Sequence, residues 1–159
     1  MTRKLLLALL LLAVFTGCDA ENHLKKAPDF TLGLLEDSSN KVTLSEMVRD
    51  QPVLLVFWAT WCPSCRNEIP LLNAWHQKYE QHGDFQILAV NVQESREHVL
   101  KFKESNPFSY SSVMDEFGDV SALYGLSGVP VSVFLAKGGE IIYYGFGLPP
   151  NVEQLLTRA

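Results

Sequence analysis

The sequence predicts an α/β domain in which a central mixed β-sheet is flanked by helices, and three observations favour this class. Val53–Trp58 is apolar throughout and residues 85–92 are largely so, which is typical of strands buried on both faces. A segment of helical character follows each run. Near the C-terminus, Lys137-Gly138-Gly139 joins two strand-like runs, which indicates a β-hairpin and an antiparallel edge.

The remaining elements follow in chain order. Residues 29–34 are expected to be extended, and residues 44–48 to form a short helix with Thr43 or Ser45 as its cap. After the first central strand we expect a helix to about Gln81, a helix at 95–105, a strand at 111–114, a short helix at 120–124, hairpin strands at Val131–Leu135 and 140–146, and a final helix at Val152–Leu156. The sequence contains no internal repeat and no low-complexity segment.

Length and composition favour one globular domain. The chain has 159 residues, of which 47% are hydrophobic and 19% charged, and this is enough for one sizeable core. Its net charge of −5 becomes −7 if an N-terminal segment carrying Arg3 and Lys4 is removed. Nucleic-acid binding requires a basic face, so this charge argues against a nucleic-acid partner.

The N-terminus has the layout of a secretory signal peptide. A short basic segment precedes an almost unbroken apolar run at 5–15, and small residues then lead to Cys18. The apolar run is too short for a comfortable transmembrane span. We therefore assign residues 1–17 to a signal peptide, 18–27 to a polar tether and 28–159 to the folded domain.

The segment Phe15-Thr16-Gly17-Cys18 resembles a bacterial lipoprotein cleavage box. The resemblance implies cleavage before Cys18 and lipid attachment to that cysteine, which would hold the domain at a membrane. Asp19 follows directly, and in enteric-type bacteria an Asp there is associated with retention at the inner membrane. The alternative is a plain signal peptide whose cleavage site happens to lie beside a cysteine.

The motif Trp61-Cys62-Pro63-Ser64-Cys65 lies where a buried strand ends and a helix begins. The thiolate is the reactive form of cysteine, and the unpaired N–H groups at a helix N-terminus favour an anion. Pro63 suits the first helical position because its missing N–H leaves no donor unpaired. We therefore expect Cys62 to be the attacking nucleophile and Cys65, one turn inward, to be the resolving thiol.

Two other interpretations of the cysteine pair remain. A structural disulfide would constrain the unfolded chain very little, because its loop holds only two residues. Half of a zinc site would need a second Cys or His pair at ligand spacing. The four histidines provide no such pair: they are His23, His76, His82 and His98. We therefore expect no metal and no cofactor beyond the cysteine pair itself.

The segment from Phe57 to Arg66 resembles the active-site region of the thioredoxin superfamily. Pro70 matches the helix-kinking proline of that family, and Gly128-Val129-Pro130 matches its cis-proline loop. The resemblance covers the chain from about Pro28 and implies a thioredoxin-like fold. It also implies that Pro130 is cis and lies against the sulfurs, and that the Val129 backbone binds an extended client peptide. The alternative for Pro130 is an ordinary proline at the start of a strand.

Three further residues next to the cysteines are expected to contact the client. Trp61 would form a partly exposed platform beside Cys62, and Pro63 and Ser64 separate the two cysteines. The Pro-Ser dipeptide looks closest to that of proteins that act in cytochrome c maturation.

One departure from ordinary thioredoxins points to a subgroup. Thioredoxins carry a buried Asp where this chain has Val56, whereas this chain has Glu68 three residues after Cys65. The pattern resembles the membrane-tethered TlpA/ResA/CcmG group, which reduces disulfides during cytochrome c maturation. In that group the equivalent Glu tunes the acidity of the cysteines, since a nearby carboxylate raises a thiol pKa. The alternative for Glu68 is an exposed carboxylate in the first turns of a helix.

The resemblance implies a reductase of disulfides in client proteins such as apocytochrome c, working in the bacterial envelope. A membrane thiol electron donor would re-reduce it, and the lipid on Cys18 would place it on the periplasmic side of the inner membrane. An envelope oxidant or isomerase is the first alternative, since the dipeptide does not decide the redox direction. A copper metallochaperone is an alternative from another class. Such carriers space their cysteines by three residues and add a distant His.

Overall fold

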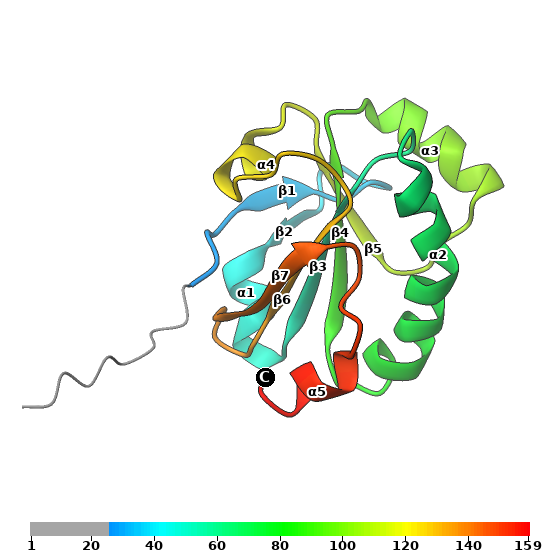
Figure 1. Cartoon of the computed structure of the whole chain (residues 1–159). Helices are drawn as coiled ribbons and strands as arrows, with labels where there is room; N and C mark the ends of the chain where they lie inside the picture. Colours follow the sequence, from blue (N-terminus) through cyan, green and yellow to red (C-terminus); the bar gives the residue numbers. More distant parts are fainter. Residues whose placement is uncertain (1–25) are drawn as a thin grey trace, which may run out of the picture.

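The computed structural model describes residues 26–159, and Figure 1 shows a central sheet with helices on both faces. The sheet has the strand order β5-β4-β3-β6-β7. Its strands are β3 (Val53–Trp58), β4 (Gln86–Val92), β5 (Ser111–Asp115), β6 (Val131–Leu135) and β7 (Ile141–Phe146). The strands β3, β4 and β5 are parallel, whereas β6 is antiparallel to both of its neighbours. The α/β class and the central mixed sheet are therefore confirmed.

The helices are α1 (Leu44–Asp50), α2 (Pro63–Trp75), α3 (Arg96–Ser105), α4 (Asp119–Leu123) and α5 (Val152–Leu156). A π-helical segment, η1 (His76–Glu80), continues α2, so the helix ends close to the expected position. Pro70 lies inside α2, as the family resemblance implies.

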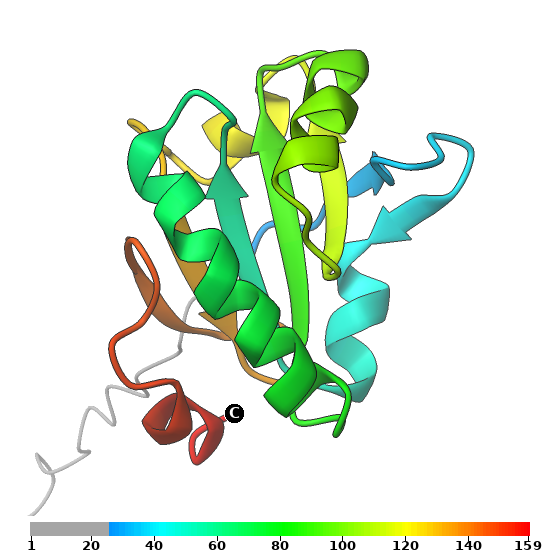
Figure 2. The same ribbon diagram turned by 90° about the vertical axis from the view of Figure 1, so that its right-hand side faces the viewer.

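Alternation along the central strand divides the core into two layers. Leu54, Val56 and Trp58 pack beneath α2, α3 and α5, and Figure 2 shows α2 and α3 side by side on this face. The odd-numbered neighbours on β3 pack against α1 and α4 instead. Every residue of β3 is buried, because helices cover the sheet on both faces. The central strand therefore gives the loop that follows it a rigid base.

A small antiparallel pair, β1 (Thr31–Gly33) with β2 (Lys41–Thr43), lies beside the main sheet. The strand β2 was not expected from the sequence, because its three residues are too few to show a periodicity. The expectation that Thr43 or Ser45 caps α1 is confirmed in position but not in its hydrogen bonding. Thr43 occupies the N-cap position but bonds Thr31 through its hydroxyl, and Asp29 accepts the N–H of Ser45 at 2.8 Å instead.

The first described residues already pair with the domain. Lys26 forms a bridge with Glu140, and the N–H of Ala27 donates to the carbonyl oxygen of Gly139 at 2.9 Å. The expected signal peptide and Cys18 lie outside the described residues. Among residues 26–159, no helix combines the length and the hydropathy that a bilayer span requires.

Candidate active site

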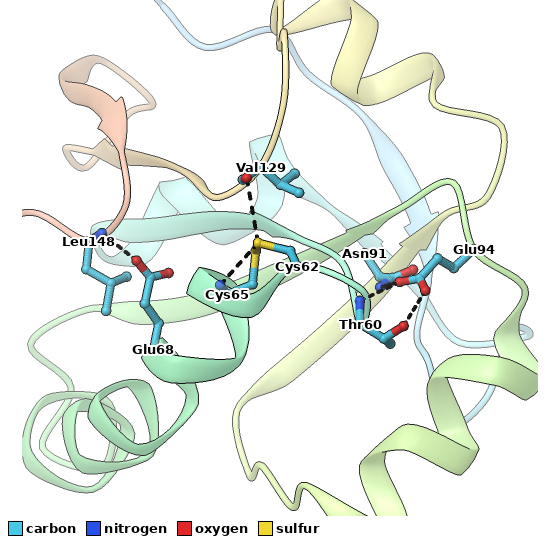
Figure 3. Close-up of a disulfide and its surroundings, with 8 residues drawn as sticks. All are labelled: Thr60, Cys62, Cys65, Glu68, Asn91, Glu94, Val129 and Leu148. Carbon is cyan, nitrogen blue, oxygen red and sulfur yellow. Dashed lines mark hydrogen bonds between the residues drawn. A yellow bond between two sulfur atoms is a disulfide. The ribbon is translucent and has the colours of Figure 1, made fainter.

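The Cys62–Cys65 disulfide lies at the junction of β3 and α2 (Figure 3). Cys62 is the N-cap of α2, and Pro63 takes the first helical position, as the sequence predicts. The N–H of Cys65 donates to Sγ of Cys62 at 3.2 Å, so this sulfur lies among the free N–H groups of the helix. The arrangement favours a thiolate on Cys62 after reduction.

The two cysteines are buried to a similar degree in the oxidised state, with exposed fractions of 4% for Cys62 and 3% for Cys65. Exposure therefore does not distinguish their roles. The residues between and before them are exposed: Trp61 is 66% exposed, and Pro63 and Ser64 also face solvent. Trp61, Pro63 and Ser64 are thus accessible beside the buried disulfide.

The Val129–Pro130 peptide bond is cis, as the family resemblance implies. The carbonyl oxygen of Val129 lies 3.6 Å from Sγ of Cys62, so the reduced thiol can donate a hydrogen bond to it. The carbonyl oxygen of Pro130 accepts the N–H of Gly147 at 3.1 Å, which ties the loop after β7 to this segment. Residues 67 positions apart in the chain thus form one site.

A cleft of about 260 Å³ lies beside Trp61, which precedes Cys62 in the chain, and Val129, whose carbonyl oxygen faces the Cys62 sulfur. Trp61 and Val129 form part of its wall, together with Val92, Gln93 and Leu126. The cleft brings together two of the residues that the sequence predicts to contact a client. The apolar side chains of its wall are those of Trp61, Val92, Leu126 and Val129.

Glu68 lies one turn beyond Cys65 on α2 and is half-buried. Its Oε1 accepts the N–H of Leu148 at 3.2 Å, whereas its Oε2 is buried with no hydrogen-bond partner among the described residues. Burial raises the pKa of this carboxyl, and the bond from Leu148 only partly offsets the rise. Burial also raises the pKa of Tyr110, and the charge of Glu68 adds to that rise. The interpretation of Glu68 as an exposed carboxylate is therefore wrong.

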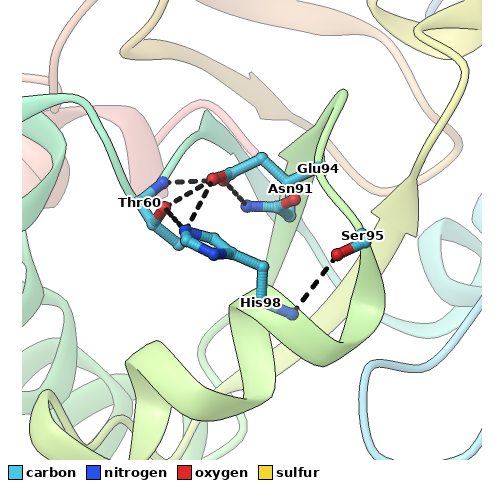
Figure 4. A network of polar contacts seen from close by, with 5 residues as sticks. All are labelled: Thr60, Asn91, Glu94, Ser95 and His98. Atoms are coloured by element: carbon cyan, nitrogen blue, oxygen red, sulfur yellow. Dashed lines mark hydrogen bonds and ion pairs between the residues drawn. The ribbon is translucent and has the colours of Figure 1, made fainter.

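A second carboxylate at the site was not expected from the sequence. Glu94 follows β4, and its carboxylate accepts hydrogen bonds from Thr60 and Asn91 (Figure 4). His98, which looked isolated in the sequence, contacts the Thr60 hydroxyl at 3.0 Å. The signal available was that Thr60 and Glu94 follow adjacent parallel strands, whose C-terminal ends meet at one sheet edge.

The described residues contain no group of three or more His, Cys, Asp or Glu side chains arranged to hold a metal ion. The donor set at the site consists of two sulfurs in a disulfide and the separate carboxylates of Glu68 and Glu94. What the arrangement can do chemically is exchange thiols and disulfides.

Comparison with known proteins identifies the family. Residues 24–144 match the model of the AhpC/TSA family. The chain is 36% identical over 115 residues to the thiol-disulfide oxidoreductase ResA of Geobacillus thermodenitrificans, covering 72% of this chain and 64% of the relative. It is 31% identical over 131 residues to ResA of Bacillus subtilis, covering 82% and 70%. The chain thus spans about two thirds of the length of these relatives.

A solved structure of a thiol–disulfide protein is similar to this chain in both fold and sequence. A putative thiol:disulfide interchange protein DsbE from Chlorobium tepidum superimposes with a TM-score of 0.72 at 31% identity. The match covers 86% of this chain and 94% of that protein. With its thioredoxin-like sheet and its redox-active cysteine pair, the chain belongs to the AhpC/TSA family and, within it, to the ResA-type thiol–disulfide oxidoreductases.

Proposed function

We propose that this protein reduces disulfides of client proteins in the bacterial cell envelope, with Cys62 as nucleophile and Cys65 as resolving thiol. The Cys62 thiolate attacks one client sulfur, the client disulfide breaks, and the other client sulfur leaves as a thiolate that takes up a proton. Cys65 then attacks Cys62 in the mixed disulfide and releases the second client thiol. The client gains two electrons and two protons, and Cys62–Cys65 becomes oxidised.

The hydrogen bond from the N–H of Cys65 to Sγ of Cys62 carries this assignment. It places the Cys62 sulfur at the positive end of α2, where a thiolate is stabilised both before attack and as a leaving group. Cys65 lies inside the first turn of α2, and its own N–H donates to the sulfur of Cys62. The two thiols therefore have unequal acidity, which is the basis of an ordered two-step exchange.

The segment Val129–Pro130 and the adjacent cleft are proposed to hold the client. An extended peptide can pair with the backbone at Val129, whose carbonyl oxygen lies 3.6 Å from Sγ of Cys62. Trp61 borders the same cleft and offers a flat apolar surface. Pro63 and Ser64, exposed between the cysteines, complete the proposed contact area.

Glu68 is proposed to handle the proton of the resolving thiol. Because burial raises its pKa, the carboxyl group retains a proton to higher pH than an exposed carboxyl and can act as a proton acceptor and donor beside the cysteines. Its buried and unpaired Oε2 is available to receive that proton. The charge of Glu68 would also raise the pKa of a nearby thiol, so the two groups would titrate as a coupled pair.

The proposed clients include apocytochrome c during cytochrome c maturation, and a membrane thiol electron donor is proposed to re-reduce Cys62–Cys65. The similarity to ResA and to a DsbE-like protein supports this reading, as does the presence of Glu68. The N-terminal pattern supports export and lipid attachment at Cys18, which would keep the domain on the periplasmic side of a membrane.

Trapping of the mixed disulfide tests the function directly. A Cys65→Ser chain expressed in the native envelope should accumulate client proteins bound through Cys62, because the resolving step is blocked. The matched Cys62→Ser chain should trap none. Capture of only unrelated secreted proteins with structural disulfides would contradict the proposed client class, and trapping through Cys65 instead would contradict the assignment of roles.

A second candidate function is that of an oxidant or isomerase. This second function is supported by the similarity to a putative protein disulfide isomerase from Bacteroides thetaiotaomicron, which is 28% identical with a TM-score of 0.72. The reduction potential separates the two functions. A reductase should equilibrate near the thioredoxin range, about −270 mV, whereas a value near about −120 mV would favour the oxidant.

A further inference from the structure

We infer that Glu94 is a positioning residue for Cys62, acting through the turn that joins β3 to α2. The turn runs from Ala59 to Cys62 and is closed by the N–H of Cys62, which donates to the carbonyl oxygen of Ala59 at 3.2 Å. Thr60 and Trp61 are its two central residues. The conformation of Thr60 therefore sets where Trp61 and the Cys62 sulfur lie.

The Glu94 carboxylate accepts hydrogen bonds from both the backbone N–H and the hydroxyl of Thr60 in this turn (Figure 4). The backbone N–H of Thr60 donates to Oε2 of Glu94 at 2.7 Å, and the Thr60 hydroxyl bonds to Oε1. The side-chain amide of Asn91, on β4, donates to Oε2 at 2.8 Å. The Glu94 side chain is only 7% exposed, so the three contacts are shielded from competition by water.

The donors in this network determine which ring nitrogen of His98 carries the proton. A backbone N–H and an amide NH₂ can only donate, so Oε2 of Glu94 accepts from both. If the single proton of the Thr60 hydroxyl points to Oε1, the hydroxyl oxygen must accept from Nε2 of His98 at 3.0 Å. His98 then carries its proton on Nε2 and lies 3.7 Å from Oε1 of Glu94. Its side chain is 64% exposed, so it forms the outer edge of the network.

The chain adopts an unfavourable conformation to bring Glu94 to this position. Gln93, directly after β4, has a φ of +57° and is the one residue other than glycine with positive φ among residues 26–159. Its N–H donates to the carbonyl oxygen of Asp115 at 2.9 Å, which holds the turn in place. Left-handed backbone at a residue other than Gly is costly and concentrates at functional sites. The strained backbone at Gln93 is a second observation, independent of the hydrogen bonds, that supports a functional role for the position of Glu94.

The turn sets two contacts of the Cys62 sulfur, one with the N–H of Cys65 and one with the carbonyl oxygen of Val129. The sulfur must stay near the N–H of Cys65 for its thiolate to be stabilised, and near the carbonyl of Val129 for a client to bind beside it. The conformation of the turn determines both contacts, because Cys62 is the last residue of the turn and the N-cap of α2. Loss of the Glu94 bonds would let the sulfur move and weaken the thiolate.

The test is the pH dependence of alkylation at Cys62 in the reduced full chain, read on the Cys62 peptide by mass spectrometry. Compared with Glu94→Gln, which also removes the carboxylate charge, Glu94→Ala should move the half-point to higher pH and slow alkylation at neutral pH by about three- to fivefold, the range of a helix-terminus effect. Glu94→Gln should stay within about twofold of the parent, because its amide can still accept from Thr60 N–H while His98 changes tautomer.

Glu80→Ala is the matched control. Glu80 and His76 form a His–Glu pair four residues apart, as Glu94 and His98 do, but at the opposite end of the helical segment that begins at Pro63. This variant should lower stability and leave the Cys62 profile unchanged. An equal shift in Glu80→Ala, or an unchanged profile in folded Glu94→Ala, would overturn the inference.

If Glu94→Ala does not fold, Thr60→Val and Thr60→Ser decide the matter. Thr60→Val keeps the backbone bond to Glu94 and loses the hydroxyl bond, so it should slow alkylation, whereas Thr60→Ser should restore it. Equal profiles for the two variants would refute the inference. The inference rests on the proposed assignment of Cys62 as nucleophile. Preferential alkylation of Cys65 in the parent chain would refute that assignment, separately from the role of Glu94.

Discussion

Glu68 and Glu94 lie on opposite sides of the Cys62–Cys65 disulfide in Figure 3 and differ in how their carboxylates are hydrogen-bonded. Glu94 accepts from a backbone N–H, a hydroxyl and an amide. Glu68 accepts from one backbone N–H, and its Oε2 has no partner among the described residues. Both side chains are largely or partly withdrawn from water, so burial alone does not separate them.

The difference shows how one site uses the same side chain in two ways. A carboxylate surrounded by donors is held in one position and holds its donors in turn. A buried carboxylate with too few donors is unstable as an anion, so its pKa rises and it can take up a proton. Glu94 therefore has the environment of a fixed support, and Glu68 that of a proton carrier.

Removal of each side chain gives the largest expected contrast. Glu94→Ala leaves the buried Thr60 N–H and the Asn91 amide without partners, so it should lower the free energy of unfolding by about 2–4 kcal/mol. Glu68→Ala removes a poorly satisfied carboxylate and should change it by less than about 1 kcal/mol. Urea unfolding of the oxidised proteins measures both. Equal losses would remove the distinction between the two glutamates.

The pH dependence of stability should identify Glu68. Because its pKa is raised in the folded state, the native protein binds more protons than the unfolded chain between the ordinary carboxyl pKa and the raised value. Stability is therefore full below this window and falls as pH rises through it. Glu68→Gln should abolish that fall and be more stable than the parent above the window.

Urea midpoints measured from pH 4 to pH 8 test this expectation. Glu104→Gln, which changes an exposed carboxyl on α3, is the control and should follow the parent chain at every pH. A Glu68→Gln curve parallel to that of the parent would contradict the raised pKa.

Two glycines with the same backbone conformation sharpen the role of Glu68. Gly147 has a φ of +70° and Gly125 a φ of +69°, so alanine at either position should cost about 1 kcal/mol. A Cβ at Gly147 would lie 3.1 Å from Oε1 of Glu68, whereas a Cβ at Gly125 would have nothing within 4 Å. Only Gly147→Ala should therefore alter the pH profile of disulfide reduction. Identical profiles in the two variants would show that Glu68 does not take part in the proton transfer.

The smallest expected effect concerns the strained residue before Glu94. Gln93→Gly removes the cost of a left-handed backbone and should raise the free energy of unfolding by up to about 1 kcal/mol. Thermal unfolding of the oxidised protein measures it. A loss of stability would mean that the Gln93 side chain, which packs over Gly118, stabilises the turn more than its backbone destabilises it.

The cysteine site could be predicted largely from local sequence, whereas the Glu94 network could not. Cys62, Pro63 and Cys65 lie next to one another in the chain, so the strand before them and the helix after them fix their arrangement. Thr60 and Glu94 are 34 positions apart, and only the pairing of β3 with β4 brings them together. The hydrogen bonding at the N-terminus of α1 could not be predicted for the same reason, because the acceptor, Asp29, lies 16 positions before Ser45.

The sequence by itself determined the order of the strands and helices apart from β2, and the position of the cysteine pair at a helix N-terminus, whereas the cis-proline loop was implied by the family resemblance. These depend on apolar periodicity, on proline and on residues close in the chain. The tertiary structure decided the proton affinity of Glu68 and the support that Glu94 gives to Cys62. Both depend on burial and on which donors reach each carboxylate, and packing of distant segments sets these quantities.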